Sequence, residues 1–139
     1  MVKLRYEKMA RILIIENEEL LAQTLARMLE LSGHEVLVAT NAANGVAQGV
    51  AVRPDLIIAD WMLGGRLHGG EVAALIADAC PRVKTIIITG YIGIASQVRG
   101  SDNRIDEVIE KPFHTEQMLA AVRRLLSKTQ FSAAERRRA

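Results

Sequence analysis

PDLIIADWML, residues 54–63, is the stretch of this 139-residue chain that decides its fold. Residues 56–59 form a short apolar run that leaves no polar face for water. Such a run predicts a strand buried on both sides, as in a parallel sheet covered by helices. Asp60 follows directly, so a carboxylate stands where this strand leaves the core.

Four further short runs rich in β-branched residues also predict strands, at residues 12–15, 36–39, 85–88 and 108–109, and at least three of the five runs are too uniformly apolar to have one face in water. Segments with helical spacing of apolar residues lie between them, although the spacing is weaker in residues 41–52 and weakest after Tyr91. Alternating strands and helices predict an α/β fold, a doubly wound (βα)5 parallel sheet with right-handed crossovers. We expect the flavodoxin-like strand order 2-1-3-4-5, with two helices on one face and three on the other.

Polar residues stand at the ends of four of these runs. They are Glu16 and Asn17 after the first, Asp60 after the third, Thr89 after the fourth and Lys111 after the fifth. Ligands of such folds bind outside the carboxyl ends of the strands, where these side chains would converge. Two acids invite a divalent cation such as Mg²⁺, and a lysine beside a hydroxyl suits the oxygens of a phosphoryl group.

Composition narrows the class of protein. A chain of this length fits one domain, and its net charge of +2 is concentrated in the last residues, which does not suggest a nucleic-acid-binding face. Cys80 is the single cysteine, so a reducing, cytoplasmic location fits best. No apolar run approaches the length of a membrane span, so we expect no membrane association. We predict an N-terminal extension at residues 1–10, one domain at 11–127 and a disordered basic tail at 128–139.

Four stretches together resemble the receiver domain of two-component response regulators, over Arg11 to about Ser127. They are ILIIENEEL at residues 12–20, PDLIIADWML at 54–63, IIITGY at 86–91 and EKPF at 110–113. Each is weak alone, and their order makes chance agreement improbable. The resemblance is to the stand-alone, single-domain type, because few residues follow the last predicted helix.

The resemblance implies a role for each residue at the strand ends. Asp60 would accept the phosphoryl group, Glu16 would hold Mg²⁺ through water, and the backbone carbonyl of Met62 would be a further metal ligand. Thr89 would bond the phosphoryl group, and Lys111 would pair with the acceptor carboxylate and then with the phosphoryl oxygens. The Lys111-Pro112 peptide would be cis. This division of work suits phosphoryl transfer, which needs positioning and charge neutralisation.

Three positions depart from the family pattern. Asn17 stands where a second acid is usual, and metal ligation and capping of the first helix are equal alternatives for its side chain. Val108 stands three residues before Lys111, where many receivers have the aromatic ring that couples to the threonine; Tyr91 is a substitute for that role. The loop after Asp60 carries four glycines between residues 64 and 70, where Pro-Gly is more usual.

The expected function is a phosphorylation switch rather than an enzyme that turns over a separate substrate. The phosphodonor would be a sensor histidine kinase or a histidine phosphotransfer protein, the output an unidentified protein target, and a homodimer is compatible with the sequence. Two alternatives stay open: a pseudo-receiver that is never phosphorylated, and a fragment of a larger regulator or hybrid kinase. A flavodoxin-like enzyme is the weakest reading, because no Gly-rich phosphate loop follows the first strand.

Overall fold

The computed structural model describes residues 9–91 and 104–127. Five strands form a single parallel sheet in the order β2-β1-β3-β4-β5, which confirms the predicted order. Their bounds are β1 Arg11–Ile15, β2 Glu35–Ala39, β3 Leu56–Asp60, β4 Lys84–Thr89 and β5 Glu107–Glu110. Each strand contains the apolar run that predicted it and extends by one or two residues beyond it.

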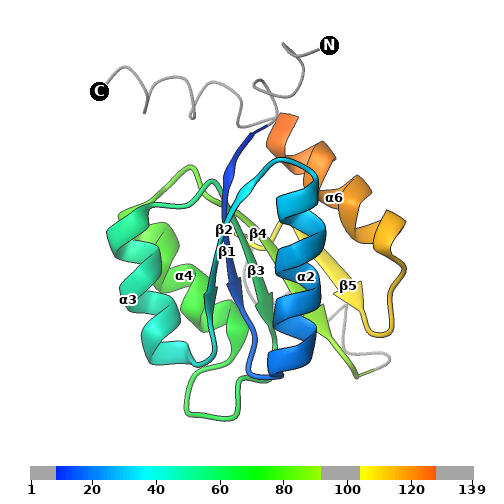
Figure 1. Cartoon of the computed structure of the whole chain (residues 1–139). Helices are drawn as coiled ribbons and strands as arrows, with labels where there is room; N and C mark the ends of the chain where they lie inside the picture. The colour runs from blue at the N-terminus through cyan, green and yellow to red at the C-terminus, as the bar shows by residue number, and fades with distance from the viewer. Residues whose placement is uncertain (1–8, 92–103, 128–139) are drawn as a thin grey trace, which may run out of the picture.

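Helices cover both faces of the sheet (Figure 1). On one face lie α2, Glu19–Leu31, and α6, Thr115–Ser127; on the other lie α3, Ala42–Val52, and α4, Gly69–Ala79. The helix predicted after Tyr91 falls in residues 92–103, outside the described residues, as do most of the N-terminal extension and the tail at 128–139. No helix in the described part of the chain is long and apolar enough to cross a bilayer.

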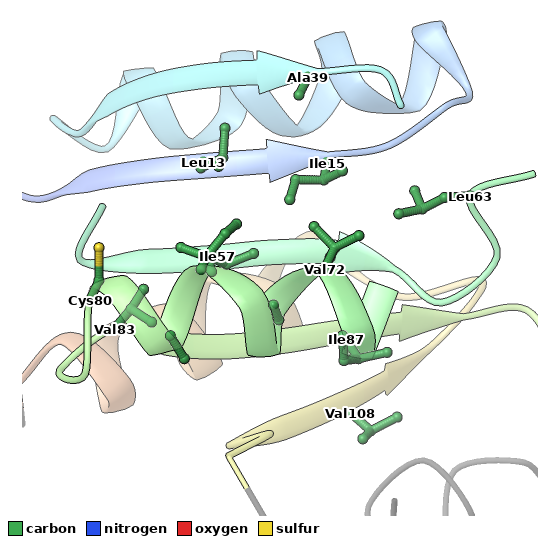
Figure 2. Packing of buried hydrophobic residues seen from close by; sticks show 14 residues of the cluster. Leu13, Ile15, Ala39, Ile57, Leu63, Val72, Cys80, Val83, Ile87 and Val108 are labelled. Atoms are coloured by element: carbon green, nitrogen blue, oxygen red, sulfur yellow. The ribbon is translucent and has the colours of Figure 1, made fainter. Parts of the chain in front are cut away.

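Two hydrophobic clusters, one on each face of the sheet, form the core. Successive residues of a strand point to opposite faces. Accordingly, Ile57 belongs to the cluster under α3 and α4, and its neighbour Ile58 belongs to the cluster under α2 and α6. Figure 2 shows the first cluster, in which Ile57 and Val72 lie between the sheet and α4. Both faces of β3 are buried, as its uniformly apolar sequence predicts.

Candidate functional site

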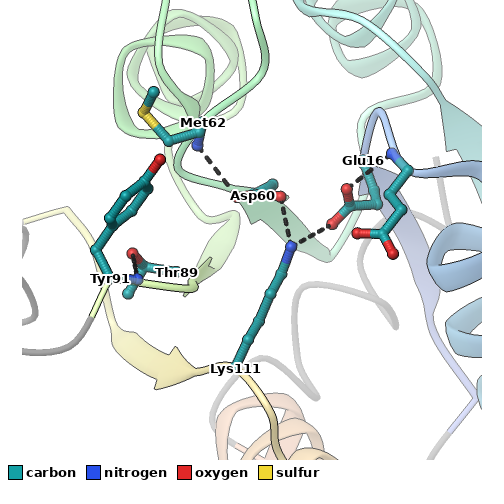
Figure 3. A network of polar contacts seen from close by, with 7 residues as sticks. Glu16, Asp60, Met62, Thr89, Tyr91 and Lys111 are labelled. Atoms are coloured by element: carbon teal, nitrogen blue, oxygen red, sulfur yellow. Dashed lines mark hydrogen bonds and ion pairs between the residues drawn. The ribbon is translucent and has the colours of Figure 1, made fainter.

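The predicted site residues lie at the carboxyl ends of the strands. Asp60 ends β3 and Thr89 ends β4, while Glu16 and Lys111 directly follow β1 and β5. Because the strands are parallel, these four positions meet at the carboxyl edge. Figure 3 shows the Asp60, Glu16 and Lys111 side chains pointing toward one another across this edge.

The Lys111 ammonium joins the two carboxylates. Its Nζ donates to Asp60 Oδ2 at 2.7 Å and lies 3.4 Å from Glu16 Oε1. The Glu16 and Asp60 side chains are 1% and 8% exposed, whereas that of Lys111 is 23% exposed. The site is therefore a pair of buried acids with one cation reaching in from the solvent side.

Glu16 is held by its own loop. Its Oε2 accepts from the Glu18 backbone N–H at 2.9 Å. Its Oε1 is buried and has no hydrogen-bond partner among the described residues, although it lies at ion-pair distance from Lys111. Burial raises the pKa of Glu16; the hydrogen bond from Glu18 and the charge of Lys111 oppose this, and the charge of Asp60 adds to it.

The environment of Lys111 favours its charged form. Burial alone would lower the pKa of its ammonium, but the hydrogen bond to Asp60 and the charges of Asp60 and Glu16 outweigh burial and raise it. Lys111 is therefore a fixed positive charge beside Asp60 at neutral pH. The Lys111-Pro112 peptide that follows is cis, as predicted.

The oxygen atoms at this edge suit a hard divalent cation. Asp60 Oδ1 accepts from the Met62 backbone N–H at 3.1 Å, so residues 60–62 form a tight turn around the carboxylate. A buried Glu16 oxygen without a hydrogen-bond partner, the Asp60 carboxylate and the adjacent Met62 carbonyl are the oxygen donors that Mg²⁺ prefers. The residues present therefore fit a magnesium ion that keeps several waters.

Asn17, the residue after Glu16, is exposed and does not cap the first helix. The N-cap position of α2 belongs to Glu18, whose side chain makes no capping hydrogen bond to the described residues. The capping alternative for Asn17 is therefore wrong. No three His, Cys, Asp or Glu side chains gather into a metal-binding group in the described part of the chain.

Thr89 is fully buried at the end of β4, and its Oγ accepts from the Tyr91 backbone N–H at 3.2 Å. Tyr91 is 55% exposed, and Figure 3 shows its ring between Thr89 and Met62. Val108 is buried in β5 and supplies no ring. Tyr91 is thus linked to Thr89 through its backbone, and the predicted substitution of its ring for the missing aromatic residue stays a prediction.

His68 has a structural role that its sequence position did not suggest. His68 is the N-cap of α4, and its ring stacks on Trp61, the residue after Asp60, with ring centroids 3.8 Å apart. Glu71 completes a capping box with His68. The spacing of His68 and Glu71 just before an apolar run is the signal that could have indicated the cap.

A doubly wound sheet with an acid pair, a threonine and a lysine at its carboxyl edge defines a receiver-type regulatory domain. The sequence profile of the response regulator receiver domain matches residues 12–123, and the chain belongs to this family. Receiver domains are regulatory parts of two-component systems, and phosphorylation and Mg²⁺ are typical of the family.

The chain is similar to parts of larger regulators. It is 32% identical over 123 residues to the DNA-binding dual master transcriptional regulator RpaA of Synechocystis sp., covering 87% of this chain and 51% of RpaA. It is 29% identical over 119 residues to response regulator MprA of Mycobacterium avium, covering 86% and 52%. The chain therefore spans about half the length of these relatives.

One solved structure with the same architecture is matched over almost its whole length. The CheY-like receiver domain protein of Methanospirillum hungatei matches with a TM-score of 0.80 and 25% identity, covering 89% of this chain and 98% of that one. The two chains therefore share one fold over the part of this chain that is matched.

Proposed function

We propose that this domain accepts a phosphoryl group on Asp60 from a phosphohistidine of a sensor histidine kinase or histidine phosphotransfer protein, with Mg²⁺ as cofactor. The observation that carries the proposal is the Lys111 ammonium, 2.7 Å from the buried Asp60 carboxylate and 3.4 Å from that of Glu16. A buried acid held by a fixed cation, beside a second acid whose buried Oε1 makes no hydrogen bond to the described residues, suits an acceptor of a highly charged group.

In the proposed reaction, one Asp60 oxygen attacks phosphorus, an O–P bond forms and the N–P bond to the donor histidine breaks. Lys111 pairs with the Asp60 carboxylate before transfer and with the phosphoryl oxygens after it. Thr89 bonds the phosphoryl group from the end of the neighbouring strand. Glu16, Asp60 and the Met62 carbonyl would hold Mg²⁺, which supplies positive charge to the oxygens of the transferring group when bound.

The proposed consequence is a switch in protein–protein interactions, with no turnover of a separate substrate. The chain spans about half of RpaA and of MprA, which supports the alternative that this domain works beside an output domain. RpaA is a DNA-binding regulator. A stand-alone regulator without nucleic-acid partner is the other arrangement that the sequence predicts. The cytoplasmic location and the homodimer also stay predictions.

A second candidate is a pseudo-receiver that is never phosphorylated. Asn17 favours it, because this position contributes no charge to a metal and leaves two carboxylates at the site. Weak metal binding would slow phosphoryl transfer or prevent it.

Incubation with acetyl phosphate and Mg²⁺, followed by intact mass spectrometry, tests the proposed function. We expect one acid-stable, base-labile phosphate on the parent protein and none on Asp60→Asn. Asp55→Asn is the matched control, because Asp55 lies just before the opposite end of β3, where its Oδ2 accepts a hydrogen bond from the Arg11 backbone N–H. Labelling that survives Asp60→Asn would place the acceptor elsewhere, and an unlabelled parent protein would favour the pseudo-receiver.

A further inference from the structure

The residue after Asp60 is clamped by an aromatic contact. Trp61 is the single tryptophan of the chain, and the planes of its ring and the His68 ring lie 19° apart in a stack. Both residues are half-buried, and Trp61 also packs against the hydrophobic cluster under α4. The stack therefore joins the phosphoacceptor turn to the start of α4.

The His68 ring is itself fixed by the first turn of α4. Its Nδ1 accepts from the Glu71 backbone N–H at 3.2 Å, and its own backbone N–H donates to Glu71 Oε1 at 3.0 Å. Its Nε2 lies 3.5 Å from the same Glu71 oxygen. Because Nδ1 is an acceptor, the ring proton of the neutral form sits on Nε2, facing Glu71. The ring thus has one orientation, the one that lies flat on Trp61.

The backbone of Trp61 is held on both sides. Its N–H donates to Ile88 O at 2.8 Å, and its carbonyl accepts from Gly69 N–H at 2.9 Å. A side chain on Gly69 would put its Cβ 2.1 Å from the Asp60 carbonyl oxygen, so α4 begins in direct contact with the acceptor's backbone. These two hydrogen bonds fix the peptide planes on either side of Trp61, and with them the backbone that leads from Asp60 to Met62.

From this arrangement we infer that His68 is a positioning residue for the Asp60 site, acting through the ring of Trp61. The inference rests on the proposed function, since it concerns the placement of the acceptor carboxylate and the Met62 carbonyl. Phosphoryl transfer depends on placement to within an ångström, and ligand orientation sets metal affinity. Releasing the Trp61 ring is therefore expected to loosen residues 60–62, which would both accept the phosphoryl group and bind Mg²⁺.

Two substitutions at one position separate the ring from the cap. His68→Asn keeps a good N-cap and removes the stacking ring. His68→Phe keeps a ring to stack on Trp61 and removes the capping acceptor. We expect His68→Asn to weaken Mg²⁺ binding, measured by calorimetry, and to slow labelling by acetyl phosphate, each by about tenfold. His68→Phe should lower the Tm yet restore both Mg²⁺ affinity and labelling toward the parent values.

A third variant reaches the stack from another side. The Cβ of Gly70→Ala would lie 2.9 Å from Trp61 Cζ3 and 3.2 Å from His68 Cε1, so both rings must shift. We expect it to reproduce the losses of His68→Asn. Near-ultraviolet circular dichroism, which reports the packing of Trp61, should change in His68→Asn and Gly70→Ala and should be largely retained in His68→Phe.

Parental Mg²⁺ affinity and labelling in His68→Asn would overturn the inference and leave His68 as a helix cap. Equal losses in His68→Phe and His68→Asn would also overturn it, because the ring would then make no difference. The calorimetric comparison needs no phosphoryl transfer. A parent protein that binds Mg²⁺ but is not labelled would therefore count against the proposed function, whereas equal Mg²⁺ affinities would count against the positioning role.

Discussion

Asn17 shows how one side chain sets the strength of a site. It is exposed and directly follows Glu16, whose carboxylate shares the site with that of Asp60, and it brings an amide where a third carboxylate would add charge. A unit charge at a few ångströms from a divalent ion contributes several kcal/mol at an effective dielectric near 20, of which solvent leaves a part. The identity of residue 17 is thus expected to change metal affinity while leaving in place the two carboxylates that would hold the ion.

Asn17→Asp should tighten Mg²⁺ binding by at least about tenfold, equivalent to roughly 1.4 kcal/mol. The added charge attracts the ion and should also speed the labelling of Asp60, while a third acid without metal lowers the stability of the metal-free protein slightly. Calorimetric titration with Mg²⁺ measures the affinity. Ser32→Asp is the control, because it adds the same charge at the far end of α2. Equal affinities in Asn17→Asp and the parent would mean that residue 17 does not face the ion.

His34 predicts a pH effect that is separate from the site. Its Nδ1 accepts from the Ala10 backbone N–H at 3.1 Å just before β1. Burial lowers the pKa of His34, and the charge of Asp55 opposes this in part. In the unfolded chain His34 has its usual pKa of 6.5, so as the pH falls it binds a proton there before it does in the folded protein. The free energy of unfolding is therefore at its full value above pH 6.5 and decreases as the pH falls through the lower folded-state pKa.

His34→Asn should remove this pH dependence, because an asparagine oxygen can accept the Ala10 hydrogen bond without titrating. Urea unfolding at pH 7.5 and pH 5.5 measures it: the parent should lose more stability on acidification than the variant. His114→Asn, which changes an exposed histidine, should follow the parent. Identical pH profiles for the parent and His34→Asn would contradict the prediction.

Among the elements, α3 and α4 show how closely two helices approach when a glycine faces the contact. Gly49 lies in α3 with its Cα against Ile76 of α4, and a Cβ there would be 2.5 Å from Ile76 Cδ1. Both residues are buried. The weak helical pattern of residues 41–52 therefore has a structural reason: Gly49 lowers helix propensity but allows the approach to α4, and Gly45 likewise allows close contact with Ile15 of β1.

Gly49→Ala should destabilise the fold by about 1–3 kcal/mol through overpacking, although alanine is the better helix former. Denaturant unfolding gives the difference in free energy of unfolding. Gly65→Ala is the control, because nothing lies within 4 Å of a Cβ at that loop position, and it should be neutral. A stabilised Gly49→Ala protein would mean that Ile76 yields and that helix propensity decides the outcome.

The elements also show which features sequence reasoning can reach. The runs in β1 and β3 are apolar throughout, and that in β4 is apolar from Ile86 on, so burial on both faces could be predicted. The residues that end these parallel strands had to meet at the carboxyl end of the sheet. The stack of His68 on Trp61 could not be predicted, because it depends on the path of a loop with glycines at 64, 65, 69 and 70. Asn17 was equally ambiguous, since only the turn from Glu16 to Glu18 decides which residue caps α2.

At the scale of the whole molecule, the site joins segments that are far apart in sequence. Lys111 follows β5, Asp60 ends β3 and Glu16 follows β1, so a single ammonium links three strand ends. Breaking a buried pair by removing one partner is costly, because the remaining charge is left uncompensated. Here two acids would be left, both nearly inaccessible to solvent. The stability of the whole fold is therefore coupled to the charge state of the site.

Lys111→Met, which keeps the length of the side chain and removes its charge, should lower the free energy of unfolding in chelator by about 1–3 kcal/mol. Since the charge of Lys111 opposes the raised pKa of Glu16, its loss should raise that pKa further. A folded state that holds a proton more tightly than the unfolded chain loses stability as the pH rises through that pKa, so the deficit should grow with pH. Added Mg²⁺ should shrink the deficit, because an ion bound to the folded state stabilises it and replaces the missing cation.

Thermal unfolding of the parent, Lys111→Met and the charge-keeping Lys111→Arg, in chelator and in Mg²⁺, measures these differences. A Lys111→Met protein as stable as the parent in chelator at neutral pH would show that the two acids are already relieved by solvent or by a shared proton, and that the ion pair contributes nothing to the fold.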